Sequence, residues 1–278
     1  MGILYIVATP IGNLEDITLR ALRVLKEADL IAAEDTRRTR KLLTHYGIKT
    51  PLTSYHAHNQ AVRGPELLEK LKQGLSVALV SDAGTPGFSD PGADLAAAAW
   101  EAGIRVEAVP GPAAGVAALS ISGFKGDVTF LGFLPRRAGK RREFLARLAP
   151  EERVLILYES PQRLAGTLAE LAQVMGDRQV LVVRELTKVF EEHWRGPAAE
   201  VAQALAGREI KGECTLVLSM PAKPDEGGVD LAEELLRAAQ KTGLAGRRLA
   251  EEVAEALNLP RRRVYQAYLN LKAKKKLP

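Results

Sequence analysis

The sequence predicts an α/β protein with two α/β domains and a small C-terminal domain that is all helical. Short apolar runs alternate with stretches of helical periodicity, and most of these runs end in a loop rich in Gly or Pro. The pattern breaks near residues 118–128 and then restarts, and beyond residue 229 only helical patterns remain. We therefore expect domains over residues 1–120, 121–220 and 229–278.

The first domain is expected to hold a mostly parallel sheet with helices on both faces. Its strands are expected at residues 3–8, 30–33, 52–55, 75–80 and 106–109. Helical periodicity covers residues 18–28, a segment that ends at Leu71, and residues 93–102, and Asp16 is the expected N-cap of the first helix. Strands that alternate with helices favour parallel pairing, because each helix carries the chain back across the sheet.

The second domain is expected to repeat the alternation of strands and helices. Its strands are expected at residues 128–133, 154–158, 180–183 and 214–219, with an edge or hairpin strand at 190–195. Residues 134–142 are expected to form a basic linker. Ser160 and Pro161 are favourable residues for the start of a helix.

The C-terminal segment begins with residues 221–228, which have the Pro and Gly content of a linker. Helices are expected at residues 231–240, 247–257 and 261–272, with a turn at 258–260. The last two helices are typical of a helix-turn-helix-like unit. Tyr265 and Tyr268 are expected to belong to the core of this domain rather than to stack on nucleobases.

The composition is that of a globular protein, with 46% hydrophobic and 26% charged residues in 278. No apolar run is long enough to span a membrane and the N-terminus lacks a basic leader, so we expect a cytoplasmic protein. The single cysteine, Cys214, excludes an internal disulfide and a cysteine-rich zinc site. The four histidines show no recognised metal spacing, and no metal site is expected.

The loop at residues 81–92 follows the expected strand at 75–80, where open α/β sheets bind ligands. Its three glycines and two prolines let a ligand approach the main chain. Neither a Walker motif nor Gly-x-Gly-x-x-Gly is present, so the loop does not predict a nucleoside triphosphate or a dinucleotide. Its small residues and carboxylates suit a ligand with a cationic or hydroxyl-rich part. The alternative is a simple strand-to-helix turn capped by Ser89 or Asp90.

Seven loops form an ordered set along the chain, at residues 9–13, 33–37, 81–86, 110–112, 158–161, 184–188 and 212–215. This set resembles the tetrapyrrole methylase superfamily. Within it, the sequence is similar to a branch that methylates the 2′-hydroxyl of a cytidine in small-subunit (16S) ribosomal RNA, near the decoding site. The resemblance covers residues 1–220, and the basic helical tail also matches. It implies a homodimeric methyltransferase that holds S-adenosylmethionine, folded up, in a cleft between two α/β domains.

The resemblance also implies which residues contact S-adenosylmethionine. Residues 82–85 would lie along its methionine part. In the first half the implied contacts are Pro10, Asp82, Ala83, Gly84, Thr85, Pro112 and Ala113. In the second half they are Leu134, Glu185, Leu186, Thr187, Cys214 and Thr215.

Methyl transfer from a sulfonium to a hydroxyl is an in-line displacement that needs positioning and a group to accept the proton. The candidates at strand ends are Glu34, Asp35, His56, Glu159, Glu185 and Lys188, and the sequence does not single one out. Residues 34–38 also fit a capped, salt-bridged helix start. His56 and His58 also fit structural or RNA-contacting roles, and Lys188 also fits a solvated surface.

Clusters of Lys and Arg are candidates for contacts to RNA phosphates. The net charge is +5, and residues 261–278 hold seven Lys or Arg and no acidic residue. The candidates are Arg37 and Arg40 after the second strand, Arg136, Arg137, Lys140, Arg141 and Arg142 in the expected linker, and Arg261, Arg262, Arg263, Lys274 and Lys275 in the tail. The alternative for each cluster is a solvated surface.

Three classes of function therefore remain open at the level of sequence. They are an RNA 2′-O-methyltransferase, a methyltransferase for a small molecule of the tetrapyrrole type, and a nucleic-acid-binding protein without enzymatic activity. The basic tail argues against a small-molecule enzyme, which needs no cationic arm. The complete set of cofactor loops argues against a protein that only binds nucleic acid.

Overall fold

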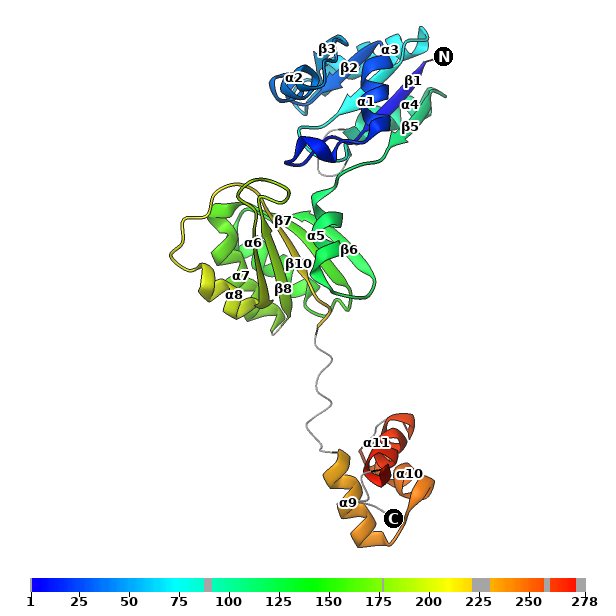
Figure 1. Cartoon of the computed structure of the whole chain (residues 1–278), viewed down its shortest axis with the longest axis vertical. Helices are drawn as coiled ribbons and strands as arrows, with labels where there is room; N and C mark the ends of the chain where they lie inside the picture. Colours follow the sequence, from blue (N-terminus) through cyan, green and yellow to red (C-terminus); the bar gives the residue numbers. More distant parts are fainter. Residues whose placement is uncertain (1, 88–91, 177, 222–230, 258–260, 274–278) are drawn as a thin grey trace. The chain divides into compact units, whose positions relative to one another are not determined.

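The computed structural model describes residues 2–87, 92–176, 178–221, 231–257 and 261–273. The chain divides into two compact units, Met1–Pro221 and Ala222–Pro278. The first unit contains two five-stranded sheets with their helices, and the second is helical (Figure 1). This arrangement confirms the expected α/β class. The described residues include no helix that is long and apolar enough to cross a membrane.

The first sheet is parallel throughout, as expected. Its strand order is β3-β2-β4-β1-β5, and every neighbouring pair runs parallel. The strands are β1 (Ile3–Val7), β2 (Leu30–Ala33), β3 (Leu52–Ser54), β4 (Val77–Val80) and β5 (Arg105–Val109). All five carboxyl ends therefore open onto the same edge of the sheet, which is where ligands bind in such folds.

Helices cover both faces of the first sheet. α1 (Leu19–Glu27) and α2 (Thr36–His45) pack on one face, and α3 (Gln60–Lys72) and α4 (Gly92–Glu101) pack on the other. The N-cap of α1 is Thr18, whose hydroxyl accepts a hydrogen bond from the Ala21 amide, and not Asp16 as expected. Asp16 instead ends a short 3₁₀ turn, η1 (Leu14–Asp16), because the chain is extended at Ile17 before the helix begins.

The chain passes from the first sheet to the second directly after β5. The next helix, α5 (Ala114–Ser122), packs through Ala118 against Ile156 and Val217 of the second sheet. The expected division at residue 120 therefore falls within a helix that belongs to the second sheet.

The second sheet is mixed, which differs from the expected repeat of the first. Its order is β6-β7-β10-β8-β9, and of these pairs β6–β7 is parallel while the others are antiparallel. The strands are β6 (Val128–Phe133), β7 (Val154–Glu159), β8 (Gln179–Arg184), β9 (Glu192–Pro197) and β10 (Cys214–Leu218). The connection from Arg184 to Glu192 is too short for the crossover that parallel strands require, so β9 returns as a hairpin strand.

The face of the second sheet opposite α5 is covered by α6 (Ala138–Leu148), α7 (Pro161–Met175) and α8 (Ala198–Leu205). Helix α6 begins at Ala138, so the expectation of a basic linker over residues 134–142 was wrong for its second half. Its residues are good helix formers, and Leu145 packs into the core one turn after Arg141. Lys140, Arg141 and Arg142 are consequently spread around the first turns of a helix, and only Arg136 and Arg137 precede it.

The second unit consists of α9 (Leu231–Thr242), α10 (Gly246–Ala256) and α11 (Arg261–Ala273) around a small apolar core. Tyr268 is 3% exposed and belongs to that core, as expected, whereas Tyr265 is 39% exposed. The expected linker lies outside the described residues except for Pro221, and so do the turn at 258–260 and the expected caps Ser89 and Asp90.

Candidate functional site

Loops from both sheets line a cleft of about 410 Å³ within the first unit. The first sheet contributes residues that follow its strands: Ile11 after β1, Glu34 and Arg38 after β2, residues 81–85 after β4, and Ala113 and Ala114 after β5. The second sheet contributes Phe133 from β6, residues 158–161 from β7, Leu186 from the loop after β8, and residues 212–215. The segment 212–215 can take part because β10 is antiparallel, which places Cys214 opposite both Glu159 and Arg184 at their strand ends.

One wall of the cleft is held together by main-chain hydrogen bonds at Gly84. The amides of Thr9 and Gly84 each donate to the other's carbonyl, at 2.9 and 3.0 Å. Gly84 has a φ of +80°, a left-handed conformation that favours glycine. The Thr85 hydroxyl donates to the Pro112 carbonyl at 3.2 Å. The loops after β1, β4 and β5 therefore form one continuous surface.

Charged groups surround the start of α2 at the edge of this wall. The Asp82 carboxylate accepts a hydrogen bond from the Asp35 amide at 2.9 Å and lies 3.5 Å from the Arg38 guanidinium. Asp35 caps α2 and pairs with Arg37 at 2.7 Å, and the hydrogen bonds from Arg37 hold the pKa of Asp35 well below its usual value. Asp35 is therefore ionised and engaged, which agrees with the helix-start interpretation.

The Glu159 carboxylate lines the cleft but is saturated with hydrogen bonds. It accepts from the Ser160 amide and from the Thr167 hydroxyl, each at 2.7 Å, and it pairs with Arg163. Glu159 is 2% exposed. Its contacts fasten the end of β7 to α7, which is a structural role.

The loop after β8 carries a second charged network. Lys188 donates to Glu185 at 2.8 Å and to Glu213 at 3.0 Å. Partial burial alone would lower the pKa of Lys188, but these hydrogen bonds outweigh burial and raise it above its usual value. Lys188 therefore stays protonated. The same loop contacts the first half, since the Asn13 amide donates to the Thr187 hydroxyl at 3.1 Å.

The structure brings eight of the thirteen expected cofactor residues together in the cleft. They are Asp82, Ala83, Gly84, Thr85, Ala113, Leu186, Cys214 and Thr215. Burial raises the pKa of the Cys214 thiol to about 11, so this wall residue is neutral. The other five do not line the cleft: Leu134 is 2% exposed in the core of the second half, Pro112 accepts a hydrogen bond from Thr85, and Pro10, Glu185 and Thr187 lie in the adjoining loops.

Of the candidates for proton transfer, Glu34 and Glu159 line the cleft, and Asp35, His56, Glu185 and Lys188 do not. His56 follows β3, which is one of the two edge strands of the first sheet and is separated by β2 from the central strands β4 and β1. Its Nδ1 is buried and has no hydrogen-bond partner among the described residues.

The expected RNA-binding cations fall into separate groups. Arg141 is not available to RNA, contrary to expectation, because it is 7% exposed and makes a bidentate ion pair with Glu170 at 2.7 and 2.8 Å. Its position one turn before Leu145 turns it towards the core. The exposed members are Arg37, Arg40, Arg136, Arg137, Lys140, Arg142 and Arg261. The side chains of Arg262 and Arg263 and the whole of Lys274 and Lys275 lie outside the described part of the chain.

Two aromatic residues of the cleft, Phe133 and Tyr158, are not among the site residues expected from the sequence, although Tyr158 belongs to the loop at 158–161. Phe133 is the last residue of β6 and Tyr158 is the residue before the last of β7, and their ring centroids lie 5.5 Å apart. The signal available in the sequence was an aromatic residue at the end of each expected strand, next to a loop of the ordered set. A single aromatic residue at a strand end is common in cores, so this signal alone would not have identified them.

Comparisons of the sequence with known proteins agree on one family. A model of the Tetrapyrrole (Corrin/Porphyrin) Methylases matches residues 3–202. A protein of Synechocystis sp. named ribosomal RNA small subunit methyltransferase I is 48% identical over 278 residues, which cover 98% of this chain and 99% of that protein. A protein of the same name from Thermotoga maritima is 50% identical over 220 residues, which cover 79% of this chain and 99% of that protein.

Solved structures share the fold. The crystal structure of uroporphyrin-III C-methyltransferase from Thermus thermophilus, complexed with S-adenosyl homocysteine, has a TM-score of 0.57 and 22% identity, covering 78% of this chain and 97% of that chain. Cobalt precorrin-4 methyltransferase, a cobalamin biosynthetic enzyme, has a TM-score of 0.60 and 19% identity, covering 78% of this chain and 94% of that chain.

The wall at Gly84 generates a test with a matched control. A Cβ at Gly84 would lie 3.4 Å from Ile11 Cγ2 and 3.5 Å from the Pro112 carbonyl, so the larger side chain of Gly84→Val must displace the wall. Gly103 has a similar φ of +69° but no atom within 4 Å of such a Cβ. Both valine variants carry left-handed strain of roughly 1–2 kcal/mol. We expect calorimetry to show that Gly84→Val binds S-adenosylmethionine, the cofactor implied by the resemblance, at least about tenfold more weakly than the wild type. Gly103→Val should bind it with the wild-type affinity. Equal affinities of the two variants would contradict the assignment of this wall.

Proposed function

We propose that this chain, which belongs to the tetrapyrrole (corrin/porphyrin) methylase family, transfers a methyl group from S-adenosylmethionine to ribosomal RNA of the small subunit. The observation that carries the proposal is a cleft lined by loops of both sheets, in a chain similar over nearly its whole length to a relative named as such a methyltransferase. The finer proposal is that the acceptor is the 2′-hydroxyl of a cytidine near the decoding site.

The residues of the cleft fit S-adenosylmethionine. Small side chains at residues 83–85 and 113–114 leave the main chain accessible, and the Asp82 carboxylate suits a ligand with cationic groups. The residues that would hold it are Asp82, Ala83, Gly84, Thr85, Ala113, Leu186, Cys214 and Thr215. When bound, this cofactor supplies a methyl group on a positively charged sulfur.

Transfer to a hydroxyl also requires a group that accepts its proton, and Glu34 is our candidate. Glu34 lines the cleft and is partly exposed, and its carboxylate accepts a long hydrogen bond from the Asp82 amide at 3.3 Å. The other candidates are less suitable: Glu159 is saturated by Ser160, Thr167 and Arg163, Lys188 stays protonated, and Asp35 is engaged by Arg37 outside the cleft lining.

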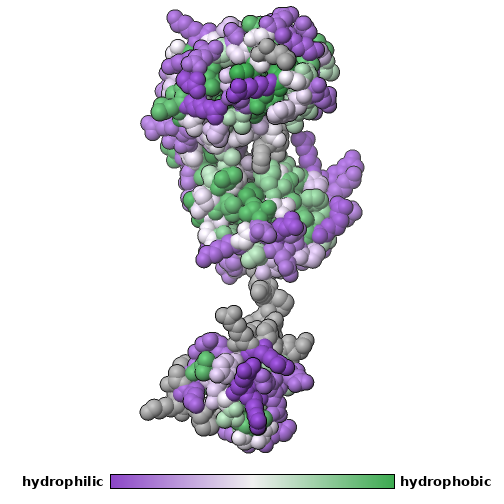
Figure 2. Space-filling model, turned by 90° about the vertical axis from the view of Figure 1, so that its right-hand side faces the viewer, coloured by the Kyte–Doolittle hydropathy of each residue, from purple (hydrophilic) through white to green (hydrophobic). Residues whose placement is uncertain are grey.

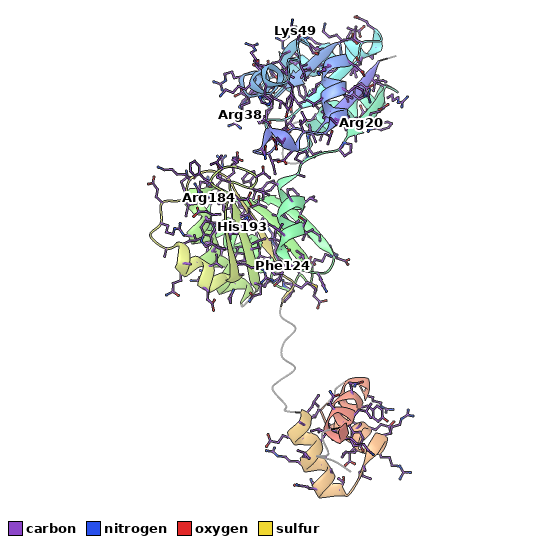
Figure 3. All side chains as sticks on the ribbon, viewed as in Figure 1. Arg20, Arg38, Lys49, Phe124, Arg184 and His193 are labelled. Carbon is purple, nitrogen blue, oxygen red and sulfur yellow. The ribbon has the colours of Figure 1, made fainter. Side chains whose placement is uncertain are left out.

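Helix α2 offers a path for RNA towards this acidic group. Its ten residues include four Arg or Lys and no acid. Arg38 lines the cleft, and Arg37, Arg40, Lys41, Thr44 and His45 line a shallow groove farther along the helix. Figure 3 shows Arg38 on the left side of the first half and Lys49, beyond the end of α2, at its top. We propose that this row of cations contacts the phosphates that flank the acceptor nucleotide.

We also propose that the protein forms a homodimer. Val116, Ile121 and Val128 are 61%, 48% and 42% exposed, on α5 and on the edge strand β6. Figure 2 shows apolar side chains gathered on one face of the second half, seen from the side on which α5 and β6 lie in Figure 1. Exposed apolar patches of this kind mark interaction surfaces.

The proposed reaction is tested by incubating the protein with methyl-tritiated S-adenosylmethionine and isolated small ribosomal subunits. We expect label in the RNA, at a ribose 2′-oxygen, with the wild-type protein. Glu34→Gln should transfer at least about 100-fold more slowly, the scale of general-base catalysis, and should keep its affinity for the cofactor. Absence of label with the wild type would contradict the proposed function. Full activity of Glu34→Gln would contradict only the assignment of Glu34 as the proton acceptor and would leave the proposed function standing.

The path along α2 is tested by the double variant Arg40→Gln/Lys41→Gln. The logarithm of RNA affinity should fall less steeply with the logarithm of salt, by about 0.7–0.9 for each phosphate that the variant no longer neutralises. The control is Lys70→Gln/Lys72→Gln, which removes the same charge from the end of α3. That end lies at the opposite edge of the sheet, where the Gly2 amide donates to the Leu71 carbonyl. Equal slopes for the two double variants would show that α2 does not contact phosphates.

Removal of residues 222–278 tests the contribution of the second unit. Binding to small subunits should weaken and depend less on salt, because the removed segment carries the cations of the tail. Affinity for S-adenosylmethionine should be unchanged, since every residue of the cleft belongs to the first unit. The relative from Thermotoga maritima, whose matched length is close to that of the first unit, makes retained catalysis the expected result. An unchanged salt slope would mean that the second unit does not bind phosphates.

A further inference from the structure

Strand β6 contains a bulge immediately before it reaches the cleft. Phe130 is opposite Ile156 and Gly132 is opposite Leu157, so Leu131 is an extra residue in the ladder. Gly132 has a φ of +65°, in the left-handed region. Bulges of this kind bend a strand and redirect the side chains that follow.

The bulge determines which face of the sheet carries Phe133. In an uninterrupted ladder Phe133 would be opposite Glu159, whose side chain points to α7 and is buried there. With the extra residue, Phe133 is opposite Tyr158 instead and shares its face. A one-residue change of register thus moves an aromatic ring out of the core and into the lining of the cleft.

Neighbouring groups hold the ring of Phe133 from one side. Its centroid lies 5.5 Å from that of Tyr158, at an angle of 59°, and Tyr158 in turn packs edge-on against Phe130 at 5.2 Å. The Tyr158 hydroxyl accepts a hydrogen bond from the Gly115 amide at 3.3 Å. Tyr158 is therefore fixed by α5 and β6, and it supports Phe133 as a stable platform.

The other side of Phe133 faces solvent. Phe133 is 62% exposed, whereas the next residue, Leu134, is 2% exposed. A large apolar ring that is held on one side and open on the other suits a planar ligand with an aromatic face. Nucleobases stack on such rings, and RNA-binding proteins use them for unpaired bases.

We propose that Phe133 is the stacking platform for the base of the acceptor nucleotide, an inference that rests on the proposed function. The acceptor belongs to a polymer, so its base reaches the exposed rim of the cleft, while the cofactor residues proposed above line the interior. Stacking on Phe133 requires a base with one free face. The substrate is therefore an unpaired nucleotide, or one that is turned out of its helix before transfer.

The test compares Phe133→Leu with Phe133→Trp and with Trp100→Leu. Leucine keeps an apolar side chain but removes the aromatic face, and tryptophan restores it. Trp100 is a matched control, because it is 66% exposed near the end of α4, at the edge of the first sheet opposite the cleft. For each protein, KM and kcat for methyl transfer to small ribosomal subunits, affinity for S-adenosylmethionine and the oligomeric state are measured.

We expect Phe133→Leu to raise the KM for the subunit roughly 5- to 150-fold, the range for removal of one stacked base, with cofactor affinity unchanged. Phe133→Trp should retain the wild-type KM, and Trp100→Leu should resemble the wild type. An unchanged KM for Phe133→Leu would overturn the proposal. So would a decrease confined to cofactor affinity, which would make the ring an adenine platform, or a shift to monomers with the same KM, which would make it a dimer contact. If the wild type itself transfers no methyl group to RNA, the proposed function fails and this inference fails with it.

Discussion

The hydrogen-bonded bridge between Thr9 and Gly84 is the constraint on which the rest of the site depends. It joins two loops that are more than seventy residues apart, and the Thr85–Pro112 contact adds a third. Strand order places the three loops near one another, and the bridge together with the Thr85–Pro112 hydrogen bond makes them one surface. The carbonyl and the amide of Gly84 both pair with Thr9, and at a φ of +80° a residue with a side chain would resist the conformation that Gly84 adopts.

The second half of the cleft depends on strand direction rather than on a single bond. A parallel β10 would end at the cleft with Leu218, and Cys214 and Thr215 would lie at the far edge of the sheet. The antiparallel arrangement brings the beginning of β10 to the ends of β7 and β8. Mixed pairing is thus what allows residues from three non-consecutive loops to face the first sheet.

Local patterns were sufficient for the features that depend on neighbouring residues. Apolar runs identified the strands, and the loops at strand ends contained most of the cleft, including residues 82–85 and 214–215. The failures concern features set by helix phase or by long-range pairing. Arg141 looks like Arg142 in the sequence, but only Arg141 shares a helix face with Leu145. Phe133 reaches the cleft through one extra residue in a ladder, which no local pattern of hydrophobicity reveals.

The neutral state of the Cys214 thiol bears on its reactivity towards a sulfonium methyl donor such as S-adenosylmethionine. A sulfonium methyl donor alkylates thiolates more readily than hydroxyls, because the thiolate is the stronger nucleophile. With a pKa of about 11, roughly one thiol in ten thousand is ionised at neutral pH. Burial thus keeps this thiol of the cleft wall in its unreactive, protonated form.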